Sequence, residues 1–214
     1  MSSERAWERH YTRGKSVLAH PDENLVRMLA PWLAEKDMSR LAAADIGCGT
    51  GRHLRLFLEY GIPSPAGLDT SANALAVCRD LYHVPVLRGD ARALPFKEGS
   101  LDLAVAWGSL HYTIKEDLPV MLAQIRRALK AGGRLFATLR NSRDTYLKKG
   151  THRGNDVWVT DLADIEHSVV SFYAEEEVRS ALAPFARFAY GMMERTLPGD
   201  MNARIAHWYF WAER

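Results

Sequence analysis

The sequence contains few cysteines and no long apolar run. Only Cys48 and Cys78 are present. Two cysteines are too few for a disulfide framework or a zinc site, so we expect no metal and two small buried residues in a reducing compartment. No segment approaches the roughly eighteen apolar residues of a membrane span, and the first residues, which include Glu4 and Arg5, lack the apolar part of a signal peptide. These absences predict a cytoplasmic protein with no membrane partner.

The chain also lacks a strong excess of one charge. It has 28 Lys and Arg against 26 Asp and Glu, a formal net charge of +2, which is far from the concentrated excess of a dedicated nucleic-acid binder. Nucleic acid is therefore not the expected partner. With 214 residues, 47% of them hydrophobic, we expect residues 1–214 to form a single domain, as a monomer or a homodimer.

Strand-like and helix-like segments alternate over the first two thirds of the chain. Short apolar segments that suit strands lie at 41–46, 65–68, 84–87, 101–106 and 134–139. Helix-like stretches lie at 21–35, 52–60, 71–81 and 117–130, the last one ended by Gly132 and Gly133. Ser71 is the expected N-cap of the third helix. The alternation predicts an α/β protein with a mostly parallel sheet and helices on both faces.

The last third reads differently. Residues 141–166 are polar and show little apolar periodicity. A structureless connection of that length is uncommon in a compact domain, so we interpret it as a lid or substrate segment. A short helix at 175–182 precedes two strand-like runs, 187–197 and 203–212, which are separated by the turn residues 198–200. These runs are expected to pair as an antiparallel hairpin at one edge of the sheet.

A glycine-rich turn follows the first expected strand. Gly47, Gly49 and Gly51 alternate between this strand and a helix, so a ligand can approach the backbone and the helix N-terminus closely. A dinucleotide fingerprint would require glycine at position 52, where the chain has Arg52. Asp45 would repel a pyrophosphate but suits a cationic amine. The turn therefore favours a ligand with an ammonium group over a dinucleotide.

This turn resembles the first motif of class I S-adenosylmethionine-dependent methyltransferases. Further segments resemble that family's motifs in the expected order, at 67–71, 89–96, 101–106 and 129–135. The resemblance implies a Rossmann-like sheet of seven strands, mostly parallel with a C-terminal antiparallel hairpin strand, and S-adenosylmethionine as cofactor. It implies N-terminal cap helices in 1–36, a cofactor-binding core in 40–140, the lid in 141–166, and a C-terminal helix and hairpin in 167–214.

The resemblance also assigns roles in cofactor binding. Asp69 lies about twenty residues beyond the glycine turn, at a strand end, where a carboxylate accepts hydrogen bonds from ribose hydroxyls, and Thr70 assists it. Asp90 would accept a hydrogen bond from the adenine amino group, with the Ala91 N–H facing a ring nitrogen. Two alternatives remain open: Asp69 only caps the following helix, and Asp90 is an ordinary turn residue.

The methionine end of the cofactor is expected at the glycine turn. Asp45 and the backbone from Gly47 through Cys48 and Gly49 to Gly51 would contact it. The segment 7–14 resembles a stretch that folds over the cofactor in many small-molecule methyltransferases.

From that segment, Tyr11 and Arg13 would reach the cofactor carboxylate and Trp7 would cover it. Alternatively, the segment is a surface helix whose Trp7 and Tyr11 only pack on the core.

The segment after the fourth strand carries the candidate base. Trp107 is assigned to the cofactor site, and His111 is the leading catalytic candidate because the pKa of a free histidine, about 6.5, suits proton removal at neutral pH. Tyr112 is the second candidate. His111 could instead only shape the pocket, and His152 and His167 in the lid are alternatives.

The acceptor is expected to be a small molecule with an oxygen, nitrogen or sulfur nucleophile. Position 107 onward lacks the Asp/Asn-Pro-Pro-aromatic motif of amino-methylating enzymes, and no Pro-Cys pair for cytosine methylation is present. Alternatives are an RNA or other macromolecular methyltransferase, a non-catalytic S-adenosylmethionine-binding protein and a dehydrogenase. A cluster of basic residues lies beside the expected site; its members are Arg140, Arg143, Lys148, Lys149 and Arg153. The cluster would bind a phosphate, a carboxylate or a nucleic-acid backbone. Alternatively, these charged side chains are only solvated.

Overall fold

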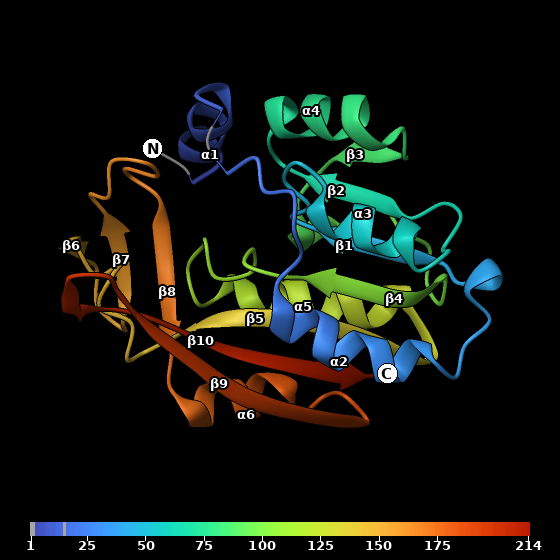
Figure 1. Ribbon diagram of the computed structural model, residues 1–214. Coiled ribbons are helices and arrows are strands. Elements are labelled where there is room, and N and C mark those ends of the chain that lie inside the picture. Colours follow the sequence, from blue (N-terminus) through green and yellow to red (C-terminus); the bar gives the residue numbers. More distant parts are fainter. Residues whose placement is uncertain (1–2, 15) are drawn as a thin grey trace.

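Seven strands form one continuous series across the molecule. A computed structural model describes residues 3–14 and 16–214 (Figure 1). The series runs in the order β3-β2-β1-β4-β5-β10-β9, and β10 is antiparallel to both of its neighbours. The strands are β1 Ala43–Ile46, β2 Ala66–Asp69, β3 Val86–Arg88, β4 Leu101–Ala106, β5 Leu129–Asn141, β9 Arg187–Leu197 and β10 Asp200–Glu213. The expected sheet, including the C-terminal antiparallel hairpin, is confirmed.

Helices cover both faces of this sheet. The strand period of two divides β4 between two apolar clusters: Leu103 and Val105 face one, and Ala104 and Ala106 face the other. The first cluster packs under α2 Glu23–Leu33, α3 Arg52–Glu59 and α4 Ala72–Tyr82; the second packs under α5 Asp117–Ala128 and α6 Glu175–Leu182. None of these helices, nor any other in the part of the chain that the structure describes, is long and apolar enough to cross a membrane.

Helix boundaries follow local capping chemistry. The Ser71 hydroxyl accepts a hydrogen bond from the Ala74 N–H at 3.1 Å, so Ser71 is the N-cap of α4 as predicted. The prediction for α5 was wrong at its C-terminal end. This helix stops at Ala128, and β5 already begins at Leu129. Gly132, with a φ of 75°, lies inside β5 where the register with β4 shifts.

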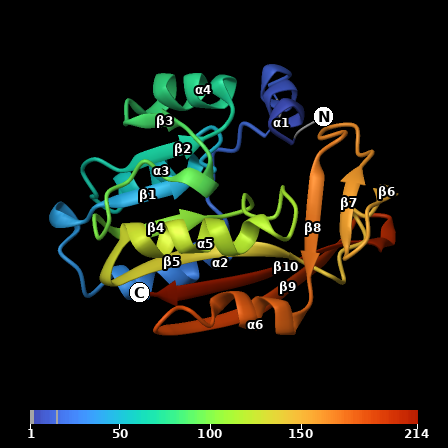
Figure 2. The ribbon, with the colours of Figure 1, turned by 180° about the vertical axis from the view of Figure 1, so that it is seen from behind.

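Two further strands lie within residues 141–166, the segment interpreted from the sequence as a lid. Residues 141–166 contain β6 Gly150–His152 and β7 Val157–Thr160, which pair antiparallel with each other, and β7 also pairs antiparallel with β8 Val169–Tyr173. The β8 strand joins the end of β5 through the pair Arg140 and Phe172. Figure 2 shows this small sheet standing beside the end of β5. The segment interpreted as a lid therefore contains two short strands, and its role as a lid stays a prediction.

The first helix lies across one edge of the molecule. Helix α1 Ser3–Thr12 is placed between α4 and β8 (Figures 1 and 2). The Asn73 side chain donates to Glu8 Oε1 at 2.8 Å, the Val169 N–H donates to Ser3 Oγ at 3.0 Å, and His10 Nδ1 lies 2.8 Å from the Asp164 carbonyl oxygen.

Of the expected cap segment, residues 1–2 and 15 lie outside the described residues. The helix α2 packs on the sheet face instead. Of the described helices in this segment, only α1 therefore has the position of a cap.

Candidate active site

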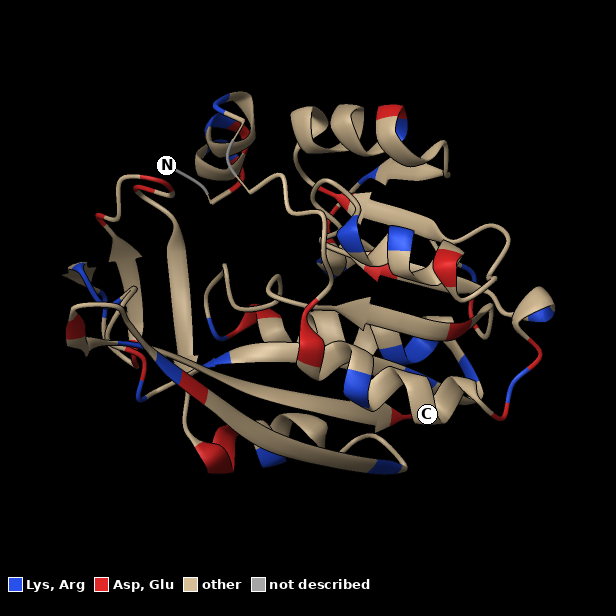
Figure 3. Cartoon of the chain, viewed as in Figure 1, with Lys and Arg blue, Asp and Glu red and all other residues tan. Residues whose placement is uncertain are grey.

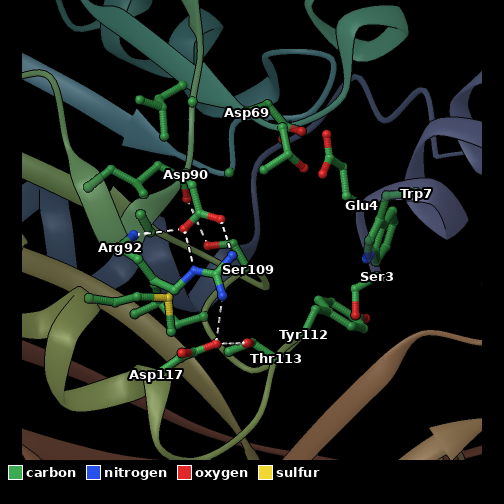
Figure 4. A pocket seen from close by; sticks show the side chains of 18 of the residues that line it. Ser3, Glu4, Trp7, Asp69, Asp90, Arg92, Ser109, Tyr112, Thr113 and Asp117 are labelled. Carbon is green, nitrogen blue, oxygen red and sulfur yellow. Dashed lines mark hydrogen bonds and ion pairs between the residues drawn. The ribbon is translucent and has the colours of Figure 1, made fainter. Parts of the chain in front are cut away.

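A cavity of about 360 Å³ opens beneath α1 at the carboxyl ends of β1, β2 and β4. In open α/β sheets ligands bind at this edge, because the loops that follow the strands are free to shape a crevice there. Figure 4 shows Asp69, Glu4 and Trp7 on one side of the cavity, with Asp90, Arg92 and Asp117 on the other. We call this space the first cavity.

The glycine turn allows two other segments to approach the strand end. Gly47 has a φ of 77°, and a Cβ atom there would lie 2.3 Å from Ser109 Cβ in the segment after β4. At Gly49 a Cβ atom would lie 2.5 Å from the hydroxyl oxygen of Tyr11 in α1. Gly51 precedes α3 without any side-chain cap, so the helix N-terminus offers its N–H groups to a ligand. A side chain at Gly47 or Gly49 would therefore clash with Ser109 or Tyr11, which explains why both positions are glycine.

Asp69 both holds the turn and borders the first cavity. Its two carboxylate oxygens accept hydrogen bonds from the Gly49 N–H and the Ser71 N–H, each at 2.9 Å. Burial raises the pKa of Asp69, while these N–H groups work in the opposite direction. Thr70 borders the same cavity. In this position Asp69 can support the start of α4 and also face a ribose in the first cavity, so the two interpretations do not exclude each other.

Asp90 is already engaged by Arg92. Both carboxylate oxygens accept from this guanidinium, at 3.0 and 2.6 Å, and Oδ1 also accepts from the Arg92 backbone N–H at 2.8 Å. Burial acts to raise the pKa of Asp90, but the bonds from Arg92 outweigh burial and hold this pKa below its usual value. Arg92 also contacts Asp117 at 3.0 Å. Asp90 and Ala91 border the first cavity, and Asp90 also caps a short 3-10 helix, Ala91–Ala93.

Three of the expected cofactor residues, Asp45, Arg13 and Gly51, border neither this cavity nor the one described next. Asp45 is fully buried, and its Oδ2 lies 3.3 Å from Nδ1 of His53. Neither Asp45 oxygen has a hydrogen-bond partner among the described residues. Arg13 is exposed and borders neither this cavity nor the one described next. Direct contact of Asp45 or Arg13 with a ligand is therefore not part of this conformation.

A second cavity of about 490 Å³ adjoins the first. Residues on the shared wall border both spaces; they are Trp7, Tyr11, Gly47, Gly108 and Tyr112. The ring centroids of Trp7 and Tyr112 are 4.7 Å apart in an edge-to-face arrangement, and Tyr11 lies 5.9 Å from Trp7. Cys48 and Trp107 are buried and border only the second cavity. The glycine turn therefore faces both spaces.

His111 is completely buried and borders the second cavity only. Its ring centroid lies 4.5 Å from Tyr112 and 5.8 Å from His207, and neither ring nitrogen has a hydrogen-bond partner among the described residues. Burial, followed by the positive charge of Arg140 and the neighbouring His207, lowers the pKa of His111 well below its usual value. The ring is therefore neutral at neutral pH and a weak proton acceptor.

The other histidine candidates, His152 and His167, border neither cavity. His152 packs against Trp158, with ring centroids 4.9 Å apart, and His167 is half-buried near Glu166. The basic cluster is dispersed: Arg143 pairs with Glu194 at 3.3 Å, and Lys148 pairs with Asp156 at 2.8 Å. Of the cluster, only Arg140 borders a cavity. In the view of Figure 3, basic and acidic residues are interspersed along the chain.

Sequence reasoning missed several residues of the site. Glu4 borders the first cavity and pairs with Arg88 at 3.1 Å. Arg195 on β9 and His207 on β10 border the second cavity. Their strands were predicted, but which residues of the hairpin face the glycine turn depends on the pairing of β10 with β5, for which the sequence carries no local signal. Within the described residues, no group of three His, Cys, Asp or Glu side chains is arranged to hold a metal ion.

Known proteins share both the sequence pattern and the fold. Residues 43–133 match the family model of a methyltransferase domain. An uncharacterized methyltransferase from Arabidopsis thaliana is 32% identical over 146 residues, which cover 63% of this chain and 40% of that protein. The demethylmenaquinone methyltransferase of Lactococcus lactis is 35% identical over 107 residues, which cover 46% of this chain and 42% of that protein. The chain thus spans less than half the length of these curated relatives.

A solved structure extends the likeness to most of the chain. A SAM-dependent methyltransferase from Methanosarcina mazei superposes with a TM-score of 0.68 at 19% identity, over 86% of this chain and 97% of that one. At this identity the likeness concerns the fold. Together with the ordered motifs and the glycine turn, it identifies the architecture. Residues 43–133 thus match a methyltransferase domain, and the chain has the fold of solved S-adenosylmethionine-dependent methyltransferases.

Proposed function

We propose that this protein transfers a methyl group from S-adenosylmethionine to an oxygen, nitrogen or sulfur nucleophile of a small-molecule acceptor. The observation that carries the proposal is the pair of adjoining cavities around one glycine turn. The first cavity has the polar groups that adenosine requires, and the second is large enough for a small acceptor. The wall shared by the two cavities is the place where donor and acceptor would meet.

The residues around the first cavity fit the cofactor. Asp69 has lone pairs left for ribose hydroxyls, because each of its oxygens accepts one hydrogen bond in the described structure. Asp90 and Ala91 would meet the adenine edge, with Asp90 shared between the ligand and Arg92. The backbone of the glycine turn would receive the methionine end. Bound S-adenosylmethionine supplies a methyl group that is already activated by its sulfonium.

The chain's own residues align the reactants and exclude water. Trp7 and Tyr112 close the shared wall with their rings, which restricts solvent at the place of transfer. His111 and Tyr112 would contact the acceptor. Because His111 is held neutral, it can accept a proton from an acceptor hydroxyl or amine, but its lowered pKa limits its strength as a base. Alignment, rather than proton removal, is therefore the main contribution that we propose for these residues.

The comparisons give some support to a small acceptor. Relatives include a demethylmenaquinone methyltransferase and a malonyl-[acyl-carrier protein] O-methyltransferase. Other relatives are tRNA (carboxymethyluridine(34)-5-O)-methyltransferases, so names alone do not choose between acceptor classes. The dispersed basic cluster argues against a nucleic-acid surface, since most of its members pair with acids or lie away from the cavities.

The proposal is tested by titrating S-adenosylhomocysteine into the protein in a calorimeter, with NAD⁺ as the comparison ligand. We expect saturable binding of S-adenosylhomocysteine and none of NAD⁺. The protein is then incubated with S-adenosylmethionine and a panel of phenols, amines, thiols, sugars and carboxylic acids while S-adenosylhomocysteine release is measured. Absence of cofactor binding contradicts the proposal, whereas binding without turnover on any acceptor favours the non-catalytic alternative.

A further inference from the structure

We propose that the second cavity selects an acceptor that carries an anionic group, a carboxylate or a phosphate, and that Arg140 and Arg195 hold this group. The inference rests on the proposed function, because it takes the first cavity as the place of the cofactor. It goes beyond that function by naming the chemical class of the acceptor.

The charged side chains around the second cavity are mostly positive. Arg52, Arg140 and Arg195 border it, against the single carboxylate of Asp22. The Asp22 carboxylate is occupied as the N-cap of α2, where it accepts from the Asn24 N–H at 2.9 Å. Arg52 and Arg195 make no ion pair with any residue that the structure describes. The cavity therefore has uncompensated positive charge that attracts an anion.

Arg140 has a free donor inside the protein. Only 8% of this residue is exposed, and its Nη1 donates to Asp144 Oδ2 at 2.7 Å. Asp144 is shared with the protein backbone, since it also accepts from the N–H groups of Ala206 at 2.9 Å and Leu147 at 3.0 Å. The Arg140 Nε is buried and has no partner within the described residues. An unpaired buried donor on a charged group is costly, and a bound oxyanion would satisfy it.

One buried histidine, His111, and one half-buried histidine, His207, complete the polar wall. His111 and His207 both border the cavity, with ring centroids 5.8 Å apart. For His207, burial and then the charges of Arg140 and Arg195 lower the pKa well below its usual value. Each ring is therefore neutral and carries one N–H, which can donate to an anion without adding a competing negative charge. The same positive surroundings that keep these rings neutral favour an anionic ligand.

The cofactor has a carboxylate of its own, so the anion could in principle be the methionine end. The positions of the arginines separate the two ligands. Arg52 is the first residue of α3, directly after the glycine turn whose backbone would receive the methionine end. Arg140 and Arg195 belong to β5 and β9, which lie beyond β4 in the sheet order and contribute no residue to that turn. We assign Arg52 to the cofactor end and the other two to the acceptor.

The test uses protein saturated with S-adenosylhomocysteine, so that the cofactor carboxylate is already in place. Inorganic phosphate and sodium benzoate are added separately while NMR follows the imidazole signals of His111 and His207, which are assigned by His111→Gln and His207→Gln. We expect both signals to shift saturably with at least one of the two anions. The better-bound anion tells whether the site prefers a phosphate or a carboxylate.

The decisive variant is Arg195→Ala, because this side chain is exposed and unpaired and its removal should leave the fold intact. We expect the apparent dissociation constant of the anion to rise at least threefold. The matched control is Arg153→Ala, which removes an exposed arginine that borders neither cavity and should change nothing. Arg140→Met should abolish binding, with its thermal unfolding measured alongside because Asp144 loses a partner.

Each contrary result has a distinct meaning. Signals that do not move with either anion, or equal anion affinity in Arg195→Ala and the parent protein, overturn the inference. A loss of S-adenosylhomocysteine affinity in Arg195→Ala also overturns it, because the arginine would then serve the cofactor. If S-adenosylhomocysteine does not bind the parent protein, the proposed function fails, and the anion titration repeated without it decides the inference separately.

Discussion

Unpaired polar atoms gather near the glycine turn and the second cavity. Asp45, His53, His111 and Arg140 each have at least one buried polar atom without a partner in the described structure. Each such group costs about 1–3 kcal/mol of folding free energy when no ligand satisfies it. The positions therefore matter: His53, His111 and Arg140 border the second cavity, where a ligand can reach them. At the scale of single residues, these unpaired atoms lower the stability of the ligand-free protein and remain available to a ligand.

Asp69 gives the first prediction. We expect Asp69→Ala to weaken S-adenosylhomocysteine binding by about 1.5–3 kcal/mol, because charge-assisted hydrogen bonds to the ribose are lost. The measurement is calorimetry at fixed pH, and thermal unfolding checks that the glycine turn survives without its acceptor. Asp80→Ala is the matched control, since this exposed carboxylate on α4 borders neither cavity. Unchanged affinity in Asp69→Ala would remove the assignment of Asp69 to the ribose.

His207 gives a prediction for the pH dependence of stability. Its pKa is lowered in the folded protein, whereas in the unfolded chain it is about 6.5. Below about pH 6.5 the His207 side chain is protonated in the unfolded state but stays neutral in the folded state. The free energy of unfolding therefore falls as the pH drops. One such histidine accounts for up to about 1.4 kcal/mol per pH unit.

The corresponding measurement is urea unfolding between pH 7.5 and 5.5. We expect His207→Gln to lose less stability than the parent protein over this range, because one of the two histidines with a lowered pKa is gone. His152→Gln serves as the control, since this exposed histidine borders neither cavity and its removal should leave the slope unchanged. An identical slope in all three proteins would show that His207 is protonated normally in the folded state.

Helix α1 is the element that covers the first cavity, and it is fastened at both sides. Asn73 of α4 donates to Glu8 at 2.8 Å, and the far side contacts Val169 and Asp164. Trp7 on this helix borders both cavities. A ligand in the first cavity can leave past α1 only if this helix moves. The hydrogen bonds that hold α1 in place should therefore control the rate of ligand release.

We therefore predict that Glu8→Ala speeds S-adenosylhomocysteine dissociation. Glu8 borders neither cavity, so the effect would come from the loss of its hydrogen bonds to α4. A net hydrogen bond is worth about 0.5–1.5 kcal/mol, which corresponds to roughly a two- to tenfold faster rate. Stopped-flow dissociation measures the rate, and hydrogen exchange of the α1 amides should rise in parallel. Arg5→Ala, on the exposed side of α1, should match the parent; equal rates in Glu8→Ala would exclude α1 as a cap.

Elements with strong local signals were predictable from the sequence. Ser71 gave α4 its start because a hydroxyl N-cap acts within one turn, and the turn at Gly199, with a φ of 81°, gave the hairpin. The strands β6 and β7 were missed. Val157, Trp158 and Val159 form a β-branched and aromatic run next to Gly154, but three or four residues are too short to stand out from the polar residues around them.

The site was predictable where it is local and unpredictable where it depends on register. The glycine turn and Asp69 lie at strand ends that sequence order alone brings together. By contrast, His207 lies opposite Arg140 only because β10 pairs with β5 in one particular register. A shift by one residue would turn His207 to the opposite face. Long-range pairing of this kind leaves no trace in either strand by itself, so the second cavity emerged only from the structure.

At the scale of the whole molecule, the C-terminal hairpin and the core form one sheet. The β10 strand pairs with β5 from His207 to Glu213, opposite Arg140 to Arg134. Trp208 and Phe210 of β10 are buried in the same apolar cluster as Leu122 of α5. The second cavity lies where the hairpin meets the core, so an acceptor would contact both. We therefore expect the hairpin and core to unfold together.

The last prediction joins this cooperativity to ligand binding. We expect one thermal transition, with the same midpoint by circular dichroism and by tryptophan fluorescence, because no part of the sheet can melt without exposing the shared apolar clusters. S-adenosylhomocysteine at a hundred times its dissociation constant should stabilise the folded state by about 2.7 kcal/mol, which raises the midpoint by roughly 5–11 °C for a domain of this size. NAD⁺ at the same concentration is the control and should not move it. Two separate transitions, of which S-adenosylhomocysteine shifts only one, would contradict the single domain. A shift by NAD⁺ alone would instead favour a dinucleotide-binding protein, the alternative against which Arg52 at the third glycine position of the fingerprint already argues.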